Sequence, residues 1–267
     1  MNHLILAITI CFCFSSNVAA QNCGATKIEE CQADGCGSDT KLNAQKNVTS
    51  DPNHATPLQV SLAQIKGLSQ PKKWKANKAR DELIGFGEGQ AVTVTALLIA
   101  AKDESGGTGE ACNCHLSSKR DTDNHLVLVT ADALSSSDFH TREATSITAE
   151  ITPRVRLQHP KWTKETLDPM IAAAPKQALP VRITGLQLFD TEHFITHHLN
   201  RFSNWEVHPI LGFEVCRKAA GCNNDSDWEK LDDIVGTVSP VAATPIKAKA
   251  KTKHKHKPKH LKLSAAL

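Results

Sequence analysis

The most regular alternation of apolar and polar residues lies between Leu179 and Cys216 and predicts two strands. In the second strand, apolar residues occupy every other position of Trp205–Val215, while Glu206 and His208 lie on the opposite face. A period of two is typical of a strand with one buried face. In the first strand, Gly185 separates two apolar phases, and a glycine at such a point indicates a β-bulge or a bend.

Similar patterns predict the other elements. Strands are expected at 91–101, 125–129 and 146–157, the last with isoleucines on one face. A change of period then indicates a short helix within 162–175, which starts either at Asp168-Pro169 or earlier at Thr163. The later start uses a strong N-cap and first-turn pair, whereas the earlier start leaves Pro169 inside the helix as a kink.

This order of elements predicts an all-β fold with one short helix. Three strands, a helix and two strands are the order of an OB-fold-like Greek-key barrel, and we expect the segment 146–157 to continue the third strand across an insertion. The alternative is a β-sandwich with one crossover helix. The barrel is expected to carry a disordered N-terminal extension and a disordered C-terminal tail.

The domain organisation follows from composition. Residues 1–20 carry a short apolar run that ends in small residues, as in a cleaved signal peptide, and this run is too short to span a membrane. We therefore expect a secreted or periplasmic protein cleaved after Ala20. The remaining segments are a polar, cysteine-containing extension with a basic stretch (21–87), the OB-like domain (88–217), a linker (218–245) and a Lys/His-rich tail (246–267).

The cysteines agree with export, because disulfides persist in oxidising compartments. An odd number remains after cleavage, so one thiol is free or pairs between chains, and their spacing does not determine the connectivity. The candidates for disulfides are Cys23, Cys31, Cys36, Cys112, Cys114, Cys216 and Cys222. The Cys-x-Cys-His run at 112–115 is also compatible with a metal corner or a redox pair, but disulfides are the favoured interpretation.

Five segments together resemble a group of uncharacterised bacterial exported proteins with an OB-like fold. They are GEACNCHL, NHLVLV, AEITPRVR, LPVRITGLQLFDTEH and WEVHPILGFEV. The resemblance covers about half the chain, 88–215, and its motifs name no chemistry. This chain departs from the group's pattern at Asn124, where an acidic residue is usual before the histidine, and carries Asp123 one place earlier.

Histidines and acidic residues at strand ends form the main chemical candidates. Such groups bind zinc or act as acids and bases, yet no H-E-x-x-H or C-x-x-C spacing is present, so a structural role is the alternative that we favour. No metal and no cofactor are predicted. The candidate catalytic residues are His115, His125, Glu150, Arg154 and His208, with Asp190, Glu192 and His193 nearby in the motifs.

The basic tail is the second candidate site. The tail carries eight lysines and no acidic residue, whereas the whole chain has a formal net charge of only +3. The rest of the chain is therefore net acidic. A lysine run without acids binds anionic polymers such as nucleic acid, envelope glycolipid or wall polymer through counterion release. The predicted polyanion-binding residues are Lys247, Lys249, Lys251, Lys253, Lys255, Lys257, Lys259 and Lys262.

Two functions remain open at this point. The first is an exported binding or scaffold protein whose tail holds it to an anionic surface. The second is an exported hydrolase of the phosphodiesterase or nuclease class that uses the His/Glu/Arg set. The second requires those side chains to meet in one site.

Overall fold

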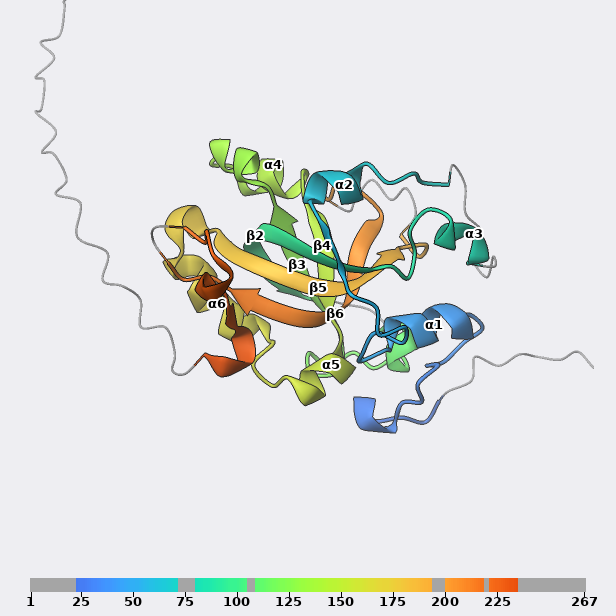
Figure 1. The fold of residues 1–267 in the computed structure, drawn as a ribbon. Helices are drawn as coiled ribbons and strands as arrows, with labels where there is room; N and C mark the ends of the chain where they lie inside the picture. Colours follow the sequence, from blue (N-terminus) through green and yellow to red (C-terminus); the bar gives the residue numbers. More distant parts are fainter. Residues whose placement is uncertain (1–22, 72–79, 105–108, 194–199, 219–220, 235–267) are drawn as a thin grey trace, which may run out of the picture.

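Five strands close into a barrel in a computed structural model of the protein (Figure 1). The structure describes residues 23–71, 80–104, 109–193, 200–218 and 221–234. The barrel runs β2–β3–β4–β6–β5 and closes where β5 pairs with β2; β4 and β6 are parallel, and the other neighbours are antiparallel. The strands are β1 (Leu58–Val60), β2 (Ala91–Asp103), β3 (Asn124–Val129), β4 (Ile147–Ile151), β5 (Leu179–Phe189), β6 (Trp205–Val215) and β7 (Glu229–Lys230).

Short helices surround the barrel (Figure 1). The α-helices are α1 (Thr40–Lys46), α2 (Leu62–Lys66), α3 (Asp81–Ile84), α4 (Phe139–Glu143), α5 (Pro153–Gln158) and α6 (Lys164–Ala173). Single 3-10 turns occur at Ile28–Glu30, Ala111–Asn113, Ala131–Ser135, Pro175–Gln177, Asp225–Asp227 and Leu231–Asp233. Helices α5 and α6 form the connection from β4 to β5, and α6 packs against β2.

The barrel interior is the main hydrophobic core. Alternate residues of each strand point inward, for example Leu126 and Leu128 of β3 and Ala149 of β4, all fully buried. On β6, Trp205 stands edge-on to Phe189 of β5, with ring centroids 5.1 Å apart. The opposite residues of β3, β4 and β6 point out of the barrel. They include the polar residues His125, Glu150, Glu206 and His208, while Val127 and Val129 of β3 belong to a second, smaller apolar cluster.

The segment 146–157 is not one strand, and this prediction was wrong. Strand β4 ends at Ile151, and Pro153 begins α5, capped by Thr152, whose hydroxyl accepts from Val155 N at 3.3 Å. A threonine followed by proline is a strong helix start, because proline at the first helical position loses no hydrogen bond. Strand β4 is itself the third barrel strand, so no insertion divides that strand.

The helix within 162–175 begins at the earlier of the two predicted positions. Thr163 caps α6 by accepting from Thr166 N, and Pro169 lies inside the helix. Asp168 is therefore an interior residue and not the N-cap.

Gly185 lies at a register shift between β5 and β6, as the change of apolar phase predicted. A Cβ atom at this position would stand 2.4 Å from Pro209 O and 2.6 Å from Val207 Cγ1. Only glycine allows the two strands to approach this closely.

Residues 23–71 form regular elements and contribute to the core, in contrast to the disordered extension that we expected. Strand β1 pairs in parallel with β2, and Leu62 and Ile65 of α2 are buried in the main core. The signal peptide, the basic stretch 72–79 and the Lys/His-rich tail lie outside the described residues. Within the described ranges, no helix is long and apolar enough to cross a membrane.

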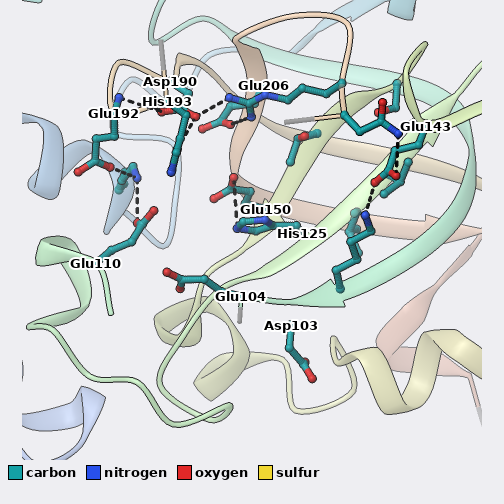
Figure 2. A pocket seen from close by; sticks show the side chains of 18 of the residues that line it. Asp103, Glu104, Glu110, His125, Glu143, Glu150, Asp190, Glu192, His193 and Glu206 are labelled. Carbon is teal, nitrogen blue, oxygen red and sulfur yellow. Dashed lines mark hydrogen bonds and ion pairs between the residues drawn. The ribbon is translucent and has the colours of Figure 1, made fainter. Parts of the chain in front are cut away.

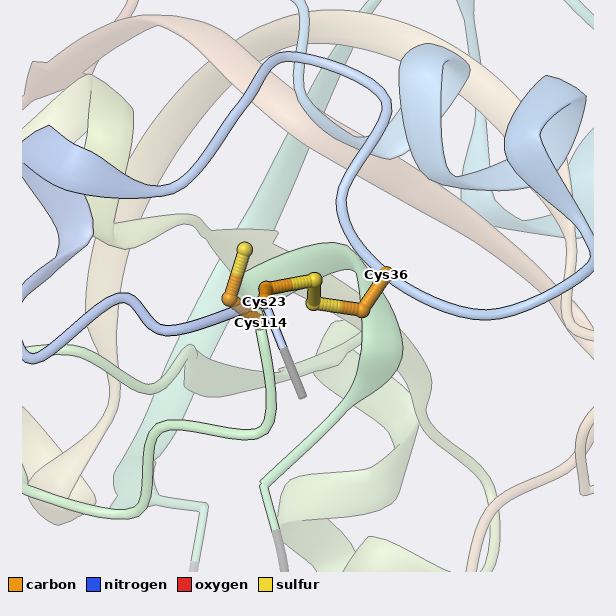
Figure 3. A group of neighbouring side chains, drawn as sticks. All are labelled: Cys23, Cys36 and Cys114. Atoms are coloured by element: carbon orange, nitrogen blue, oxygen red, sulfur yellow. A yellow bond between two sulfur atoms is a disulfide. The ribbon is translucent and has the colours of Figure 1, made fainter. Parts of the chain in front are cut away.

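Three disulfides are formed: Cys23–Cys36, Cys31–Cys114 and Cys216–Cys222, while Cys112 is a buried free thiol. Two of them belong to one cluster, in which Cys114 lies beside the Cys23–Cys36 pair (Figure 3). Cys31–Cys114 joins the N-terminal segment to the loop before β3. The Cys31–Cys114 disulfide thus links the N-terminal extension covalently to the barrel.

Candidate functional site

A polar site occupies the outer wall of the barrel over β3, β4 and β6. His125 of β3 and Glu150 of β4 are direct partners across the antiparallel pair. Glu206 and His208 stand two residues apart on β6, on the face opposite to the core residue Val207. Because strand residues alternate between faces, these four side chains project from the same side of the sheet.

The N-terminal segment and the loop before β3 form a cover beside this polar wall: Lys46 lines the same cavity as Glu150, and Asn113 donates to Asp123 Oδ1 at 2.9 Å. Asn47 donates through Nδ2 to Cys112 O at 2.8 Å, and Arg154 donates to Cys31 O at 2.7 Å. Under this cover Glu206 is only 1% exposed and His208 is fully buried. The alternation predicted that β6 has one buried face and one solvated polar face. This prediction is wrong at Glu206 and His208, because both faces of the strand are buried there.

The cavity between the wall and its cover has a volume of about 990 Å³. Carboxylates outnumber cations among its lining residues by eight to three (Figure 2). The acids are Asp103, Glu104, Glu110, Glu143, Glu150, Asp190, Glu192 and Glu206; the cations are Lys46, Lys102 and Arg201; the histidines are His125, His140 and His193.

Behind the lining residues Glu150 and Glu206, carboxylates surround one fully buried imidazole, that of His208. His208 Nδ1 lies 2.7 Å from Glu150 Oε2 and 3.3 Å from Glu206 Oε1, and His208 Nε2 lies 3.6 Å from Asp123 Oδ2. His125 Nε2 lies 3.6 Å from Glu150 Oε1, so Glu150 stands between the two histidines. The side chain of His125 is 34% exposed and borders the cavity.

Several of these atoms are close to one another but not aligned for hydrogen bonds. Both ring nitrogens of His208, Oε2 of Glu150 and Oδ2 of Asp123 are buried without a hydrogen-bond partner. Buried polar atoms are almost always satisfied in folded proteins, so each exception calls for an explanation. His125 Nε2 is also buried without a partner, so the cluster holds five such atoms, and its donors and acceptors do not satisfy one another.

Burial and neighbouring charges shift the acid–base properties of the cluster. Burial raises the pKa of Asp123 to about 7, although the charge of His208 opposes this. Burial also raises the pKa of Glu206 to about 7, and the charge of Glu150 adds to it. Burial lowers the pKa of His208, but the surrounding carboxylates outweigh this and hold it well above its usual range. Shifted pKa values of this kind are common at functional sites.

Two cations bind the acids around the cavity wall. Lys46 of α1 donates to Glu110 at 2.8 Å and to Glu192 at 2.7 Å. Arg201 bridges Asp190 and Glu206, with Nη1 3.0 Å from Glu206 Oε2. These cations are already paired, so they do not neutralise the remaining acids.

The structure brings together three of the five predicted catalytic residues: His125, Glu150 and His208. His115 is exposed, its Nδ1 contacts Gly109 O at 2.9 Å, and it does not line the cavity, although its backbone amide donates to the lining residue Glu110. Arg154 holds the N-terminal segment through backbone carbonyls and also does not line the cavity. Asp190, Glu192 and His193, which the motifs placed nearby, line the cavity wall.

The sequence reasoning did not identify Asp123, Glu206, Lys46, Glu110 and Arg201 as site residues. The motif comparison had noted Asp123 as a displaced acid, which was an available signal. Glu206 shares a strand face with His208, a second signal. Lys46 and Glu110 arrive from distant segments, and no local pattern marks them.

No family model, no curated protein and no solved structure matches this chain. The resemblance to a group of bacterial exported proteins therefore stays a prediction.

Proposed function

We propose that the protein is an exported binding protein, built on an OB-fold Greek-key barrel, whose acid-lined cavity takes a positively charged ligand. The fold assignment is supported by the strand order β2–β3–β4–β6–β5, by closure of β5 on β2, and by the helices between β4 and β5. Export is supported by the three disulfides.

The excess of carboxylates around the cavity is the observation that carries the proposed ligand class. A concave site lined by one sign of charge concentrates ligands of the opposite sign. The three lining cations contact lining acids, so a negatively charged ligand would meet no free positive group among the described lining residues. A cation of small-molecule size suits a cavity of about 990 Å³.

Calorimetric titration with spermidine, compared with an uncharged polyether of similar length, tests this proposal. Glu104 lines the cavity, and its described hydrogen bond comes from a backbone amide, Asp123 N, at 3.4 Å. Glu104→Gln is expected to weaken spermidine binding about fivefold, because one charge at close range is worth ~1 kcal/mol. Asp34→Asn removes an exposed acid outside the cavity and serves as the control. Equal binding of spermidine and the polyether contradicts the proposal.

The Lys/His-rich tail is proposed to hold the protein to anionic polymers. The support is its run of eight lysines without an acid, which contrasts with the acidic cavity. Deleting 246–267 is expected to abolish salt-sensitive retention on heparin. Retention that is unchanged by the deletion refutes this assignment and leaves the cavity proposal untouched.

A second candidate function, hydrolysis, is supported by the array His125–Glu150–His208. A partly exposed histidine beside a buried carboxylate is the combination that a general base uses, and His125 Nε2 lies 3.6 Å from Glu150 Oε1. Burial lowers the pKa of His125, but the charge of Glu150 outweighs it, and the net effect is a raised pKa. The acid excess opposes a phosphodiester substrate and favours neutral or cationic esters.

Hydrolysis of neutral and cationic p-nitrophenyl esters tests the second candidate. His125→Ala is expected to lower the rate about 10²–10⁴-fold if the imidazole acts as the base. His140→Ala replaces another cavity-lining histidine, which is strongly exposed, and is the matched control. A rate that is the same in both variants contradicts hydrolysis at this site.

A further inference from the structure

We infer that Asp123, Glu150 and His208 form a binding site for one divalent transition-metal ion, with Zn²⁺ or Mn²⁺ as the best matches. One donor atom from each residue lies within 4.8 Å of the other two. This inference rests on the proposed function, because it specifies which cation the acid-lined cavity serves. The test below can contradict the metal site without contradicting the proposed function, and the reverse.

Three neighbouring segments of the barrel wall bring these ligands together. Asp123 directly precedes β3, Glu150 lies on β4, and His208 lies on β6. Strand β4 pairs with both β3 and β6, so the three side chains project from adjacent strands on one face. Ligands on paired strands are held by the sheet, which fixes their relative positions better than loops do.

The burial of these residues argues for an ion rather than for a solvated acidic patch. Asp123 and His208 are fully buried, and Glu150 is 5% exposed. Arg201 already pairs with Glu206, but Asp123 and Glu150 are two further buried carboxylates that share a single imidazole. Buried charges are normally paired or coordinate metals, and a divalent ion supplies the missing positive charge.

The unpaired atoms are an independent observation that points to the same site. Asp123 Oδ2, Glu150 Oε2 and both nitrogens of His208 lack hydrogen-bond partners although they lie side by side. One ring nitrogen and the carboxylate oxygens that face a common ion do not align with one another as donor and acceptor, while the other ring nitrogen is left to a neighbouring carboxylate. The contact of 2.7 Å between His208 Nδ1 and Glu150 Oε2, which is not aligned as a hydrogen bond, fits such an arrangement.

The donor set indicates the class of metal. One imidazole nitrogen with carboxylate oxygens is a mixed N/O set, which suits Zn²⁺ and related first-row ions. Mg²⁺ and Ca²⁺ prefer oxygen ligands alone. Each nitrogen of His208 has a carboxylate within 3.6 Å, so the nitrogen that does not coordinate has an acceptor to orient the ring.

The cavity borders this site. Glu150 and Glu206 belong both to the cluster and to the cavity lining (Figure 2). Asp123 and His208 lie behind these two lining residues and are fully buried, so Glu150 is the proposed ligand that borders the cavity. His125 contacts Glu150 from the same side, at 3.6 Å.

The test uses the full-length chain after treatment with EDTA, titrated with Zn²⁺ and Mn²⁺ by calorimetry and checked by elemental analysis. Because the tail histidines bind zinc loosely, the triple variant His254→Ala/His256→Ala/His260→Ala is the background for all measurements. We expect one ion per chain, and at least tenfold weaker binding in Glu150→Gln, which keeps the side-chain shape. Asp34→Asn is the matched control for a lost surface charge.

A spectroscopic readout keeps the inference testable even where a variant does not fold. In the triple-histidine background without a change at the proposed site, Zn²⁺ is expected to shift the ring nitrogen resonances of His208 in long-range ¹H–¹⁵N spectra. Zinc binding that is unchanged in folded Glu150→Gln, or His208 resonances that do not respond, overturns the metal site.

Spermidine binding separates the two proposals. Binding of spermidine without stoichiometric metal overturns the metal site and supports the proposed function. Binding of metal without spermidine supports the metal site and contradicts an organic cation as the cavity ligand.

Discussion

Arg201 is the residue whose removal tests most directly how the acidic wall of the cavity is held together. Its side chain is 10% exposed and bridges two carboxylates, Asp190 and Glu206, which are 6% and 2% exposed. Arg201→Met keeps the aliphatic stem but leaves both acids without this counterion. Breaking a buried ion pair from one side costs about 3–5 kcal/mol, because a charge is left uncompensated in the interior.

The expected loss is measured by urea and thermal unfolding, followed by circular dichroism with the disulfides intact. For a domain of this size, the loss corresponds to a fall in Tm of about 6–20 °C. Arg217→Met is the matched control: its pair with Glu229 has an N–O distance of 2.7 Å, but both side chains are 42% exposed. An exposed pair contributes ~0–1 kcal/mol. Equal losses in the two variants refute the reasoning from burial.

The pH dependence supplies a second check on Arg201. Burial alone raises the pKa of Asp190, but the hydrogen bond with His193 and the charge of Arg201 hold it well below its usual range. A carboxyl with a lowered pKa stabilises the fold above its unfolded pKa, ~3.9, and this contribution disappears as the pH falls toward the folded value. The stability gap between wild type and Arg201→Met is therefore expected to be largest near pH 7 and to narrow below about pH 4. A gap that widens in acid contradicts this account.

Three further predictions concern the frame around the site. Gly185→Ala is expected to destabilise the protein by about 1–3 kcal/mol in urea unfolding, because the new Cβ meets a backbone oxygen at 2.4 Å. In the chain cleaved after Ala20, Cys112 is expected to resist Ellman's reagent in the native state and to react as one thiol per chain in guanidinium, because it is buried and burial raises its thiol pKa. Replacing both Cys31 and Cys114 by serine is expected to cost about 4–5 kcal/mol, since the disulfide closes a loop with a sequence separation of 83.

Each of these has its own control. Gly85→Ala places a Cβ no closer than 3.5 Å to a neighbour and is expected to leave stability unchanged or slightly raised. Removing Cys216–Cys222, with a separation of 6, is expected to cost about 2 kcal/mol. A larger loss of stability in Gly85→Ala than in Gly185→Ala contradicts the first prediction, and rapid labelling of Cys112 in the native protein contradicts the second. A larger loss on removal of Cys216–Cys222 than on removal of Cys31–Cys114 contradicts the third.

Local patterns were sufficient for most of the barrel strands. Strand β2 covers the predicted run of β-branched residues, and the phase change at Gly185 marked a register shift. The error at 146–157 arose because period two continued past Thr152, although Thr152-Pro153 is a helix start. Alternation measures only which residues share a face, so it does not report where the backbone leaves the sheet.

Only some of the residues of the site could be predicted from the sequence. His125, Glu150 and His208 stood out as polar residues on strand faces, and strand pairing brought them together. Asp123 and Glu206 carry the same kind of signal but were not selected. Lys46 and Glu110 reach the cavity from separate segments, and their positions depend on how the extension packs.

The sequence by itself determined the succession of strands, the bend at Gly185, the cysteines that fasten the chain and the candidate histidines, because each of these depends on neighbouring residues. Only the tertiary structure decided that the polar face of β6 is buried. That burial depends on Cys31–Cys114, on Arg154 and on Asn47, which hold a distant segment over the barrel wall. The sequence pattern predicted that these acids and histidines face solvent. In the structure they are buried as a charged cluster whose polar atoms lack partners, and the functional proposals rest on this observation.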